Sequence, residues 1–300
     1  MLNVGLVLSG GLSKGAYQIG FINALLETIP ISQIKAVAGS SIGALNGYGL
    51  LTNKLGRVEE YWRNFDCTSG LRLFKRFVFN RLLDEVLDQL VEPNDTLNRP
   101  FYVGATSIFP TLKFNYFKME SSYDSNWRKL FRAAIGFPIL TGLPKRFNRR
   151  YYIDGGVVDN IPLKPLLEEA LDLIIIVHFD SKYTIDIPLT NDDPVVLEVD
   201  LSISNRFIKT SFDFSNGLIN EMIESGYEYG KKMLKTLLKD GVDNIDAIRQ
   251  NALDIHIKEH YVRRQYTNLD TLPTFFNRRL KRFRSKANVI QPLPRADRLS

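Results

Sequence analysis

The sequence predicts an α/β fold with a mainly parallel central sheet, because the same local pattern occurs twice within residues 2–48. Each copy is a short aliphatic run, then a loop rich in glycine and serine, then small and apolar residues at helical spacing. Two successive strand–loop–helix units favour parallel strands joined by right-handed crossovers. The composition agrees, since 44% hydrophobic residues in a chain of 300 provide for a sizeable core.

The first unit begins with a strand over Leu2–Leu8 and passes through the loop Ser9–Gly15 into a helix. The second begins with a short buried strand over Ile34–Ala38, turns at Gly39–Gly43 and continues into a helix of small residues over Ala44–Tyr48. In each unit the glycines therefore lie between the end of a strand and the start of a helix.

Periodicity predicts the remaining elements. We expect helical structure over Arg57–Val91, Arg128–Ile135 and Leu218–Leu238, and strands over Phe101–Ile108, Leu112–Met119, Tyr151–Ile153 and Leu173–His178. No linker rich in proline, glycine or serine forces a division. We therefore expect one main α/β domain over residues 1–270, followed by a basic tail over residues 271–300.

The basic character of the chain belongs to this tail. The net charge is +6, yet residues 278–300 hold eight basic side chains against Asp297 alone, a net charge of +7 that leaves −1 for the other 277 residues. A nearly neutral body removes the main compositional support for nucleic-acid binding, and we expect no nucleic-acid partner.

The tail also has an amphipathic pattern. Phe276, Leu280, Phe283 and Ala287 recur at helical spacing among arginines and lysines, so the sequence predicts a C-terminal helical segment. Such a helix either lies on an anionic membrane surface or packs on the body with its charges in solvent. Both interpretations stay open, and the first predicts peripheral membrane contact.

Cysteine content and hydropathy bear on the compartment. The only cysteine, Cys67, excludes an intramolecular disulfide and any multi-cysteine metal site. No apolar run approaches the ~18 residues needed to span a bilayer, and the residues after Met1 lack the pattern of a signal peptide. We expect a cytoplasmic protein, with the membrane surface as its one alternative location.

The segment Gly39-x-Ser41-x-Gly43 has the pattern of a nucleophile elbow. In that turn a strand bends sharply into a helix, and small flanking residues let the turn present the serine hydroxyl. The predicted strand before Ser41 and helix after it supply the context that the pattern requires. Ser41 is therefore the candidate nucleophile, and a plain glycine–serine turn is the alternative.

A serine hydroxyl needs a group that accepts its proton. Among the three histidines, His178 ends a buried strand, and the order Ser41, Asp154, His178 matches the order of an α/β-hydrolase triad. His256 and His260 have a spacing seen in zinc sites but lack a third ligand, so we expect no metal.

Asp154 is the better candidate for the base. It ends a predicted strand and is followed by Gly155 and Gly156, a tight turn that other backbone can approach closely. Its carboxylate is therefore predicted to take the proton of the serine directly. An aspartate that only favours a turn is the alternative interpretation.

The loop Ser9–Gly15 is suited to anions, because glycines before a helix can present successive backbone N–H groups. A Walker phosphate loop needs Lys and Ser or Thr after its second glycine, but Ala16 and Tyr17 follow Gly15. A dinucleotide loop needs glycine where Leu12 stands. The remaining interpretation is an oxyanion hole that serves Ser41, and no cofactor is expected.

Three ordered segments together resemble the patatin-like phospholipases: Leu8–Gly20, Gly39–Gly47 and Asp154–Pro162. The segment Arg132–Pro138 is also similar to one that the family carries before its aspartate. The resemblance implies a three-layer α/β/α fold, a Ser–Asp dyad and metal-free hydrolysis of acyl esters of lipids, with phospholipid or another lipid ester as the substrate.

The resemblance also assigns roles to individual residues. It makes Ser41 the nucleophile and Asp154 the base. The backbone of Gly10, Gly11 and Leu12 becomes the oxyanion hole, and Lys14 stands where the family has Arg or Lys. The residues that support these motifs are Gly15, Gly39, Gly43, Gly155 and Gly156.

The chain departs from the family at Leu12, where members usually have a third glycine. If this position needs a positive φ, a leucine there costs about 1–3 kcal/mol of strain and its side chain narrows the site. Two alternatives stand beside a lipid acyl hydrolase that works through an acyl-enzyme, and only the second of them rests on Leu12. One is a Ser–His–Asp esterase acting on soluble esters, and the other is a non-catalytic, membrane-associated protein that keeps the fold.

Overall fold

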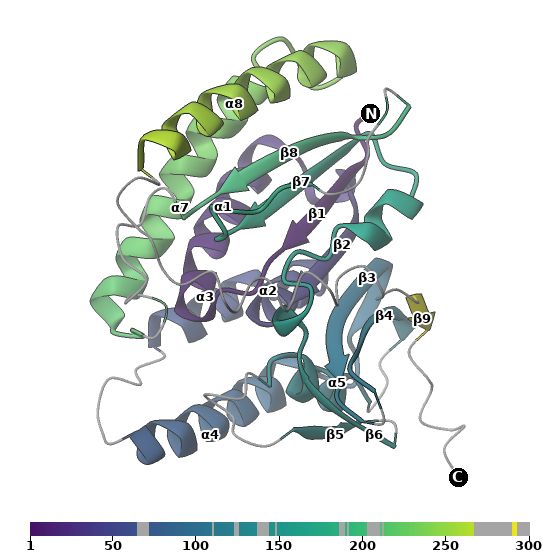
Figure 1. The fold of residues 1–300 in the computed structure, drawn as a ribbon, viewed down its shortest axis with the longest axis vertical. Helices are drawn as coiled ribbons and strands as arrows, with labels where there is room; N and C mark the ends of the chain where they lie inside the picture. Colours follow the sequence, from purple (N-terminus) through teal and green to yellow (C-terminus); the bar gives the residue numbers. More distant parts are fainter. Residues whose placement is uncertain are drawn as a thin grey trace.

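One mixed β-sheet organises the protein in a computed structural model (Figure 1). The structure describes residues 1–64, 72–109, 111–122, 126–136, 144–147, 149–185, 190, 192–202, 211, 213–266 and 290–292. Among these residues the strands are β1 (Val4–Leu8), β2 (Ile34–Ser40), β3 (Thr96–Ser107), β4 (Lys113–Ser122), β5 (Lys145–Phe147), β6 (Arg150–Asp154), β7 (Leu173–His178), β8 (Val195–Asp200) and β9 (Ile290–Pro292).

The sheet combines a parallel half and an antiparallel half. Its order is β5-β6-β3-β2-β1-β7-β8, and β4 pairs with both β3 and β9. The strands β3, β2, β1, β7 and β8 run parallel to one another, whereas β4 and β6 run antiparallel to β3. The carboxyl ends of β1, β2 and β3 therefore lie at the same edge, where the loops after β1 and β2 meet.

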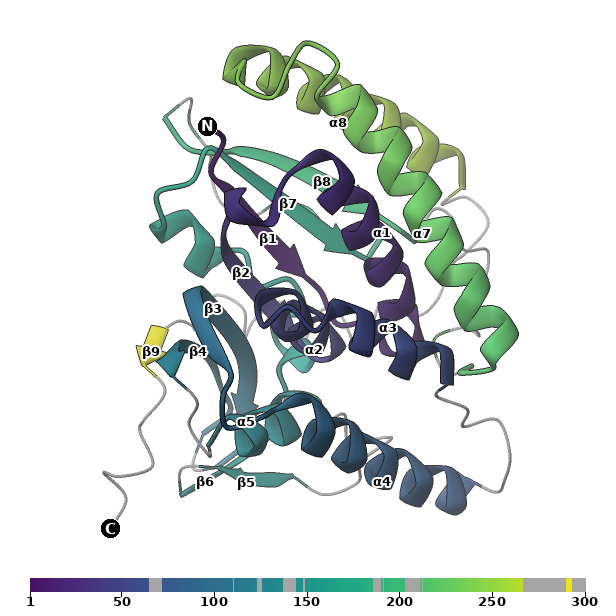
Figure 2. The same ribbon diagram turned by 180° about the vertical axis from the view of Figure 1, so that it is seen from behind.

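Helices cover the two faces of the sheet unequally (Figures 1 and 2). The α-helices are α1 (Gly15–Thr28), α2 (Ile42–Leu51), α3 (Leu55–Asn64), α4 (Arg72–Leu90), α5 (Asn126–Ala134), α7 (Asn216–Leu237) and α8 (Ile245–Tyr266). Short 3-10 helices are η1 (Leu12–Lys14), η2 (Ile31–Gln33), η3 (Gly155–Val157) and η4 (Lys164–Glu168).

The alternation of side chains along β1 shows how the layers form. Leu6 and Leu8 point into the larger core, beneath α1, α2 and α7. Val7 points to the opposite face and packs against Ile161 and Leu166, in the segment that contains η4. The α/β prediction is therefore confirmed, with long helices on one face and a thin layer on the other.

Two glycines bring α1 and α7 into backbone contact. A Cβ on Gly20 of α1 would lie 1.9 Å from the carbonyl oxygen of Ile223, and one on Gly226 of α7 would lie 2.1 Å from that of Tyr17. Both distances are far below van der Waals contact, so no larger residue fits at either position. Figure 2 shows the two helices side by side.

Several predicted elements differ from those found. The helical pattern over Arg57–Val91 corresponds to two helices, α3 and α4, and β8 was not predicted. The long helix predicted over Leu218–Leu238 is confirmed as α7. The predicted tail helix and Cys67 lie outside the described residues, but Ile290–Pro292 of the tail forms β9 beside β4. Among the described helices, none is both long and apolar enough to cross a membrane.

Candidate active site

Ser41 occupies a strained turn between β2 and α2. Its backbone has φ 53° and ψ −130°, outside the regions that L-residues ordinarily adopt. Gly39 and Gly43 make the turn possible. A Cβ on Gly39 would lie 2.5 Å from the Cα of Ala44, and one on Gly43 would lie 2.3 Å from the carbonyl oxygen of Leu8. A residue held in such a conformation typically carries strain of about 1–3 kcal/mol and marks functional sites.

Asp154 meets Ser41 although 113 positions separate them. The Ser41 hydroxyl donates to Asp154 Oδ2 at 2.5 Å, and the backbone N–H of Gly156 donates to Oδ1 at 2.8 Å. The carboxylate is held in this place because β6 pairs with β3, which puts Asp154 opposite Ala105. Gly155 is needed for this approach, since its Cβ would lie 2.4 Å from the carbonyl oxygen of Gly104.

The environment of Asp154 suits a proton acceptor. The residue is buried, and burial raises the pKa of its carboxyl to about 7, against the opposing effect of hydrogen bonds from Ser41 and Gly156. A carboxyl that titrates near neutral pH holds a proton more readily than an exposed aspartate does, yet releases it within the physiological range.

The glycine loop lies beside this pair. Gly10, Gly11, Leu12 and Lys14 line a cavity of about 220 Å³ together with Ser41, Asp154, Gly156, Asn160, Phe179 and Ser211. Leu12 has φ 54°, so this position does require the left-handed region that favours glycine. The ring of Phe179 fills the space over Gly11, where a Cβ would lie 2.4 Å from it.

Asn160 holds Gly10 in place through two hydrogen bonds. The backbone N–H of Gly10 donates to Asn160 Oδ1, and Asn160 Nδ2 donates to the carbonyl oxygen of Gly10, both at 3.0 Å. The N–H group of Gly10 therefore has a partner in this structure, and its role as an oxyanion donor stays a prediction. The N–H groups of Gly11 and Leu12 remain candidates.

Lys14 is half-buried at the edge of the cavity. Burial lowers the pKa of its ammonium group, and the nearby carboxylate of Asp200 acts in the opposite direction. Asp200 is buried at the end of β8, beside the end of β7. Lys14 therefore supplies a positive charge next to the glycine loop, and that charge faces a buried carboxylate.

His178 occupies a different place from the one that a triad requires. Its ring is buried, and Nδ1 accepts a hydrogen bond from the N–H of Asp180 at 3.3 Å. The carboxylates of Glu198 and Asp200 lie at 3.9 and 4.0 Å from its two nitrogens. His178 does not line the cavity, and Ser41 donates to Asp154 instead.

Neither of the other two histidines is among the described residues that line the cavity. His256 is exposed on α8, and His260 belongs to the same helix. Within the described part of the chain, no group of three or more potential ligands is placed to hold a metal ion.

A buried polar network that the sequence did not reveal supports the glycine loop from behind. Trp62 Nε1 donates to Asn46 Oδ1 at 3.0 Å, and Asn46 Nδ2 donates to the carbonyl oxygen of Gly15 and to Gln18 Oε1. Gln18 Nε2 in turn donates to the carbonyl oxygen of Ser9 at 2.8 Å. This chain of hydrogen bonds thus connects both ends of the loop to α2 and α3. Asn46 follows Ser41 by five positions, but the sequence alone does not show that its side-chain amide hydrogen-bonds to the backbone of Gly15.

Comparison with known proteins gives one family. Its sequence model, described as "Patatin-like phospholipase", matches residues 6–167. Lysophospholipase NTE1 of Scheffersomyces stipitis is 31% identical over 195 residues, which are 59% of this chain and 12% of that protein. Lysophospholipase nte1 of Aspergillus terreus is 30% identical over 206 residues, 60% of this chain and 12% of that protein. The chain thus matches only about an eighth of the length of these curated relatives.

A solved structure, VipD from Legionella pneumophila, aligns with 94% of this chain and 80% of its own, at 12% identity and a TM-score of 0.41. The family match covers more than half of the chain and includes both Ser41 and Asp154. This protein belongs to the patatin-like phospholipase family.

Proposed function

We propose that this protein hydrolyses acyl esters of lipids, with Ser41 as nucleophile and Asp154 as general base. The observation that carries the proposal is the 2.5 Å hydrogen bond from the Ser41 hydroxyl to a buried carboxylate, at a strained elbow beside a glycine loop. Membership of the family and the lysophospholipase relatives support a lipid ester as substrate.

The reaction has two halves. Ser41 Oγ attacks the ester carbonyl carbon while Asp154 takes the hydroxyl proton, and the tetrahedral intermediate then expels the alcohol, which leaves with the proton from Asp154. The acyl group is now an ester of Ser41. Water attacks this ester with Asp154 again as base, the fatty acid leaves, and the proton returns to Ser41.

The developing oxyanion needs donors on the side of the glycine loop. The N–H groups of Gly11 and Leu12 lie in that loop, and the N-terminus of α2 begins directly after Ser41. One preorganised donor typically lowers the barrier by about 2.7–4 kcal/mol, and a helix N-terminus adds partial positive charge. The site therefore stabilises the charge without a metal ion in this proposal.

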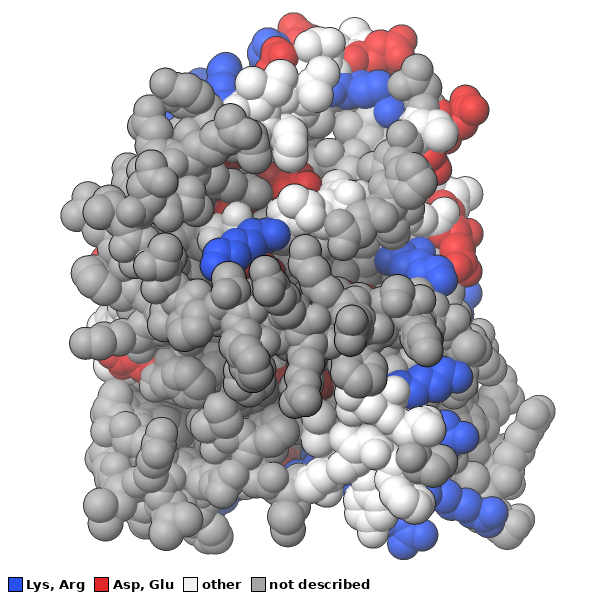
Figure 3. Space-filling model, viewed as in Figure 1, with Lys and Arg blue, Asp and Glu red and all other residues white. Residues whose placement is uncertain are grey.

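Contact with an anionic membrane belongs to the same proposal. The basic tail has a net charge of +7, against −1 for the rest of the chain. On the body, Arg146 of β5, Arg150 of β6 and Arg149 in the turn between them are exposed, beside the exposed ring of Tyr151. Figure 3 shows Lys and Arg side chains along the lower edge of this face, where Figure 1 places these strands. Arginines with an aromatic ring suit a surface of anionic lipid headgroups. A cytoplasmic location remains a prediction.

Sedimentation with liposomes tests the membrane contact. Neutralising the six basic residues of positions 278–286 with glutamine is expected to reduce binding to anionic vesicles at low salt, and high salt is expected to reduce it for the unaltered protein. Equal sedimentation of both proteins would reject a role for the tail.

Two measurements test the catalytic assignment. A fluorophosphonate probe is expected to label the protein, and lysophosphatidylcholine is expected to release fatty acid. Ser41→Ala and Asp154→Asn are each expected to abolish both signals, while folding remains visible by circular dichroism. His178→Ala is expected to keep both. Loss with His178→Ala and retention with Asp154→Asn would favour the triad, and no labelling of folded protein would favour a non-catalytic role.

A further inference from the structure

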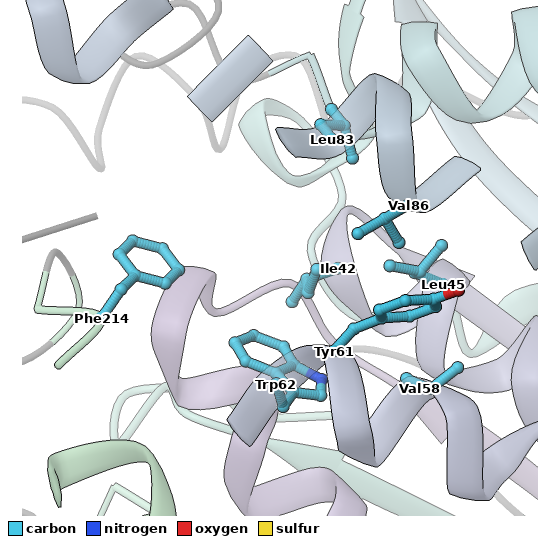
Figure 4. A pocket seen from close by; sticks show the side chains of 8 residues that line it. All are labelled: Ile42, Leu45, Val58, Tyr61, Trp62, Leu83, Val86 and Phe214. Atoms are coloured by element: carbon cyan, nitrogen blue, oxygen red, sulfur yellow. The ribbon is translucent and has the colours of Figure 1, made fainter. Parts of the chain in front are cut away.

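A second pocket is lined by Ile42, the residue that follows Ser41. It is formed between α2, α3 and α4 and encloses about 40 Å³ (Figure 4). The residues that line it are Ile42, Leu45, Val58, Tyr61, Trp62, Leu83, Val86 and Phe214. Figure 4 shows Ile42 in the middle of this group, between Trp62, Leu83 and Phe214.

The pocket and the active-site cavity are neighbours at two points of the chain. Ser41 lines the cavity and Ile42 lines the pocket, while Ser211 lines the cavity and Phe214 lines the pocket. Gly15, at the end of the glycine loop, also contacts the pocket wall. A Cβ on Gly15 would lie 2.7 Å from the ring of Trp62 and 2.8 Å from Ile42.

The interior of the pocket is apolar because its two polar side chains bond elsewhere. The hydroxyl of Tyr61 donates to Gln89 Oε1 at 2.9 Å, on the outer side of α4. The indole N–H of Trp62 donates to Asn46, toward α2. Water needs two or more polar partners to occupy a cavity, and the described residues that line this pocket present an almost wholly apolar surface. An alkyl chain fits such walls, whereas a polar headgroup would lose its hydrogen bonds.

We propose that this apolar pocket receives the terminal part of the substrate's acyl chain and thereby selects chain length. The inference rests on the proposed function, because it places the ester carbonyl at Ser41 and the hydrocarbon beyond Ile42. The small volume means that the pocket holds only the end of a chain. Each methylene that reaches it is expected to increase kcat/KM about fourfold, the equivalent of ~0.8 kcal/mol.

Binding is tested without catalysis, in a Ser41→Ala protein. Only Trp62 and Trp127 are present in the chain, so Trp127→Phe leaves a single fluorophore in the pocket wall. We expect 12-bromododecanoate, kept below its micelle concentration, to quench Trp62 saturably and more strongly than 2-bromododecanoate. Equal quenching by the two isomers, or none, would overturn the proposal.

Two further variants keep this test decisive. Adding Val86→Phe fills the pocket and is expected to weaken the quenching constant at least tenfold, whereas Leu253→Phe on the exposed side of α8 is expected to leave it unchanged. If Trp127→Phe fails to fold, Trp62→Phe serves instead. The remaining Trp127, fully buried against Tyr48, is then expected to show no quenching by either acid.

Chain-length profiles test the same idea in the active enzyme. With p-nitrophenyl esters from acetate to dodecanoate, Val86→Phe is expected to lower the dodecanoate-to-acetate ratio of kcat/KM at least tenfold. Leu83→Ala is expected to shift the optimum to longer chains. A ratio unchanged in both variants would overturn the proposal. An unaltered protein that hydrolyses none of the esters would instead contradict the proposed function, while the quenching result would stand by itself.

Discussion

The side-chain amide of Asn160 closes a pair of hydrogen bonds with the backbone of Gly10, one to its N–H group and one to its carbonyl oxygen. The two residues are 150 positions apart. The same amide oxygen fills the space over Gly156, where a Cβ would lie 2.5 Å from it. Asn160 therefore joins the glycine loop to the turn that carries Asp154.

Removing this connection is expected to reduce both stability and turnover. Asn160→Ala breaks two partly buried hydrogen bonds and should lower the free energy of unfolding by about 1–3 kcal/mol. Turnover should fall by about 10²-fold, since a misplaced loop no longer meets the oxyanion. Urea unfolding and kcat measure the two effects. Asn216→Ala, at the exposed start of α7, is the control and should change neither. Unchanged kcat in Asn160→Ala would contradict the positioning role.

The rate of hydrolysis is expected to depend on the ionisation of Asp154. Because burial raises its pKa to about 7, the base is mostly protonated in mildly acidic solution. We expect kcat/KM to increase tenfold per pH unit below about pH 7 and to level off above it. The pH profile of a soluble ester measures this. A profile already flat from pH 5 upward would show that Asp154 is not the base.

The same shift predicts how stability depends on pH. A raised pKa means that the folded protein holds the proton of Asp154 between about pH 4 and pH 7, where the unfolded chain has released it. This contribution to stability is complete below pH 4 and is lost as the pH rises to 7, at about 1.4 kcal/mol per unit. Asp154→Asn lacks this dependence, so its stability relative to the unaltered protein should increase over that range. The free energy of unfolding of both proteins is measured by urea titration at several pH values. If it depended on pH in the same way for Asp154→Asn and the unaltered protein, the expectation would be contradicted.

The elbow is expected to tolerate no side chain at Gly43. An added Cβ would lie 2.3 Å and 2.6 Å from the carbonyl oxygens of Leu8 and Ser9, and backbone atoms cannot move aside as a side chain does. Gly43→Ala should therefore destabilise the fold by more than about 3 kcal/mol. Gly56→Ala is the matched control, since no atom lies within 4 Å of its Cβ position on α3, and it should stabilise by up to about 1 kcal/mol. Thermal unfolding compares the two, and similar melting temperatures would refute the packing argument.

Leu12 provides a test of backbone strain. At φ 54° a leucine is held in a left-handed conformation that typically costs about 1–2 kcal/mol. Leu12→Gly removes the strain but also the packing of its half-buried side chain, so we expect stability within about 1 kcal/mol of the unaltered protein. Leu12→Val keeps the strain and adds a β-branch, so it should be clearly less stable than Leu12→Gly. If Leu12→Gly were the less stable variant, side-chain packing rather than the backbone φ would determine stability at this position.

Local patterns predicted the elements around Ser41 because both the elbow and its flanking strand and helix lie within a few residues of one another. The position of Asp154 beside Ser41 was predicted correctly, although its catalytic role stays a prediction. The pairing of β3 with β6, the strand that ends at Asp154, was not predicted. Period-two alternation in β4 and β6 indicates a strand but does not give its direction, so the antiparallel half of the sheet was missed.

Contacts between distant segments account for the rest. Asn160 lies in a segment that the family resemblance includes, yet nothing local to it indicates that its amide meets Gly10. The apolar pocket behind Ile42 combines side chains from three helices and Phe214, a set that no single periodic pattern contains. Such features depend on how the helices and strands pack together. Packing is determined by the whole sequence and not by any local pattern.

The close backbone contacts at Gly20 and Gly226 limit how α1 and α7 can move relative to each other. Because α1 starts at the end of the glycine loop and α7 starts two residues after Phe214, the close contact of their main chains connects the glycine loop to one wall of the apolar pocket. Neither helix can slide along the other without a backbone collision. Any widening of the apolar pocket must therefore come from α3 and α4, which carry the wall opposite Phe214.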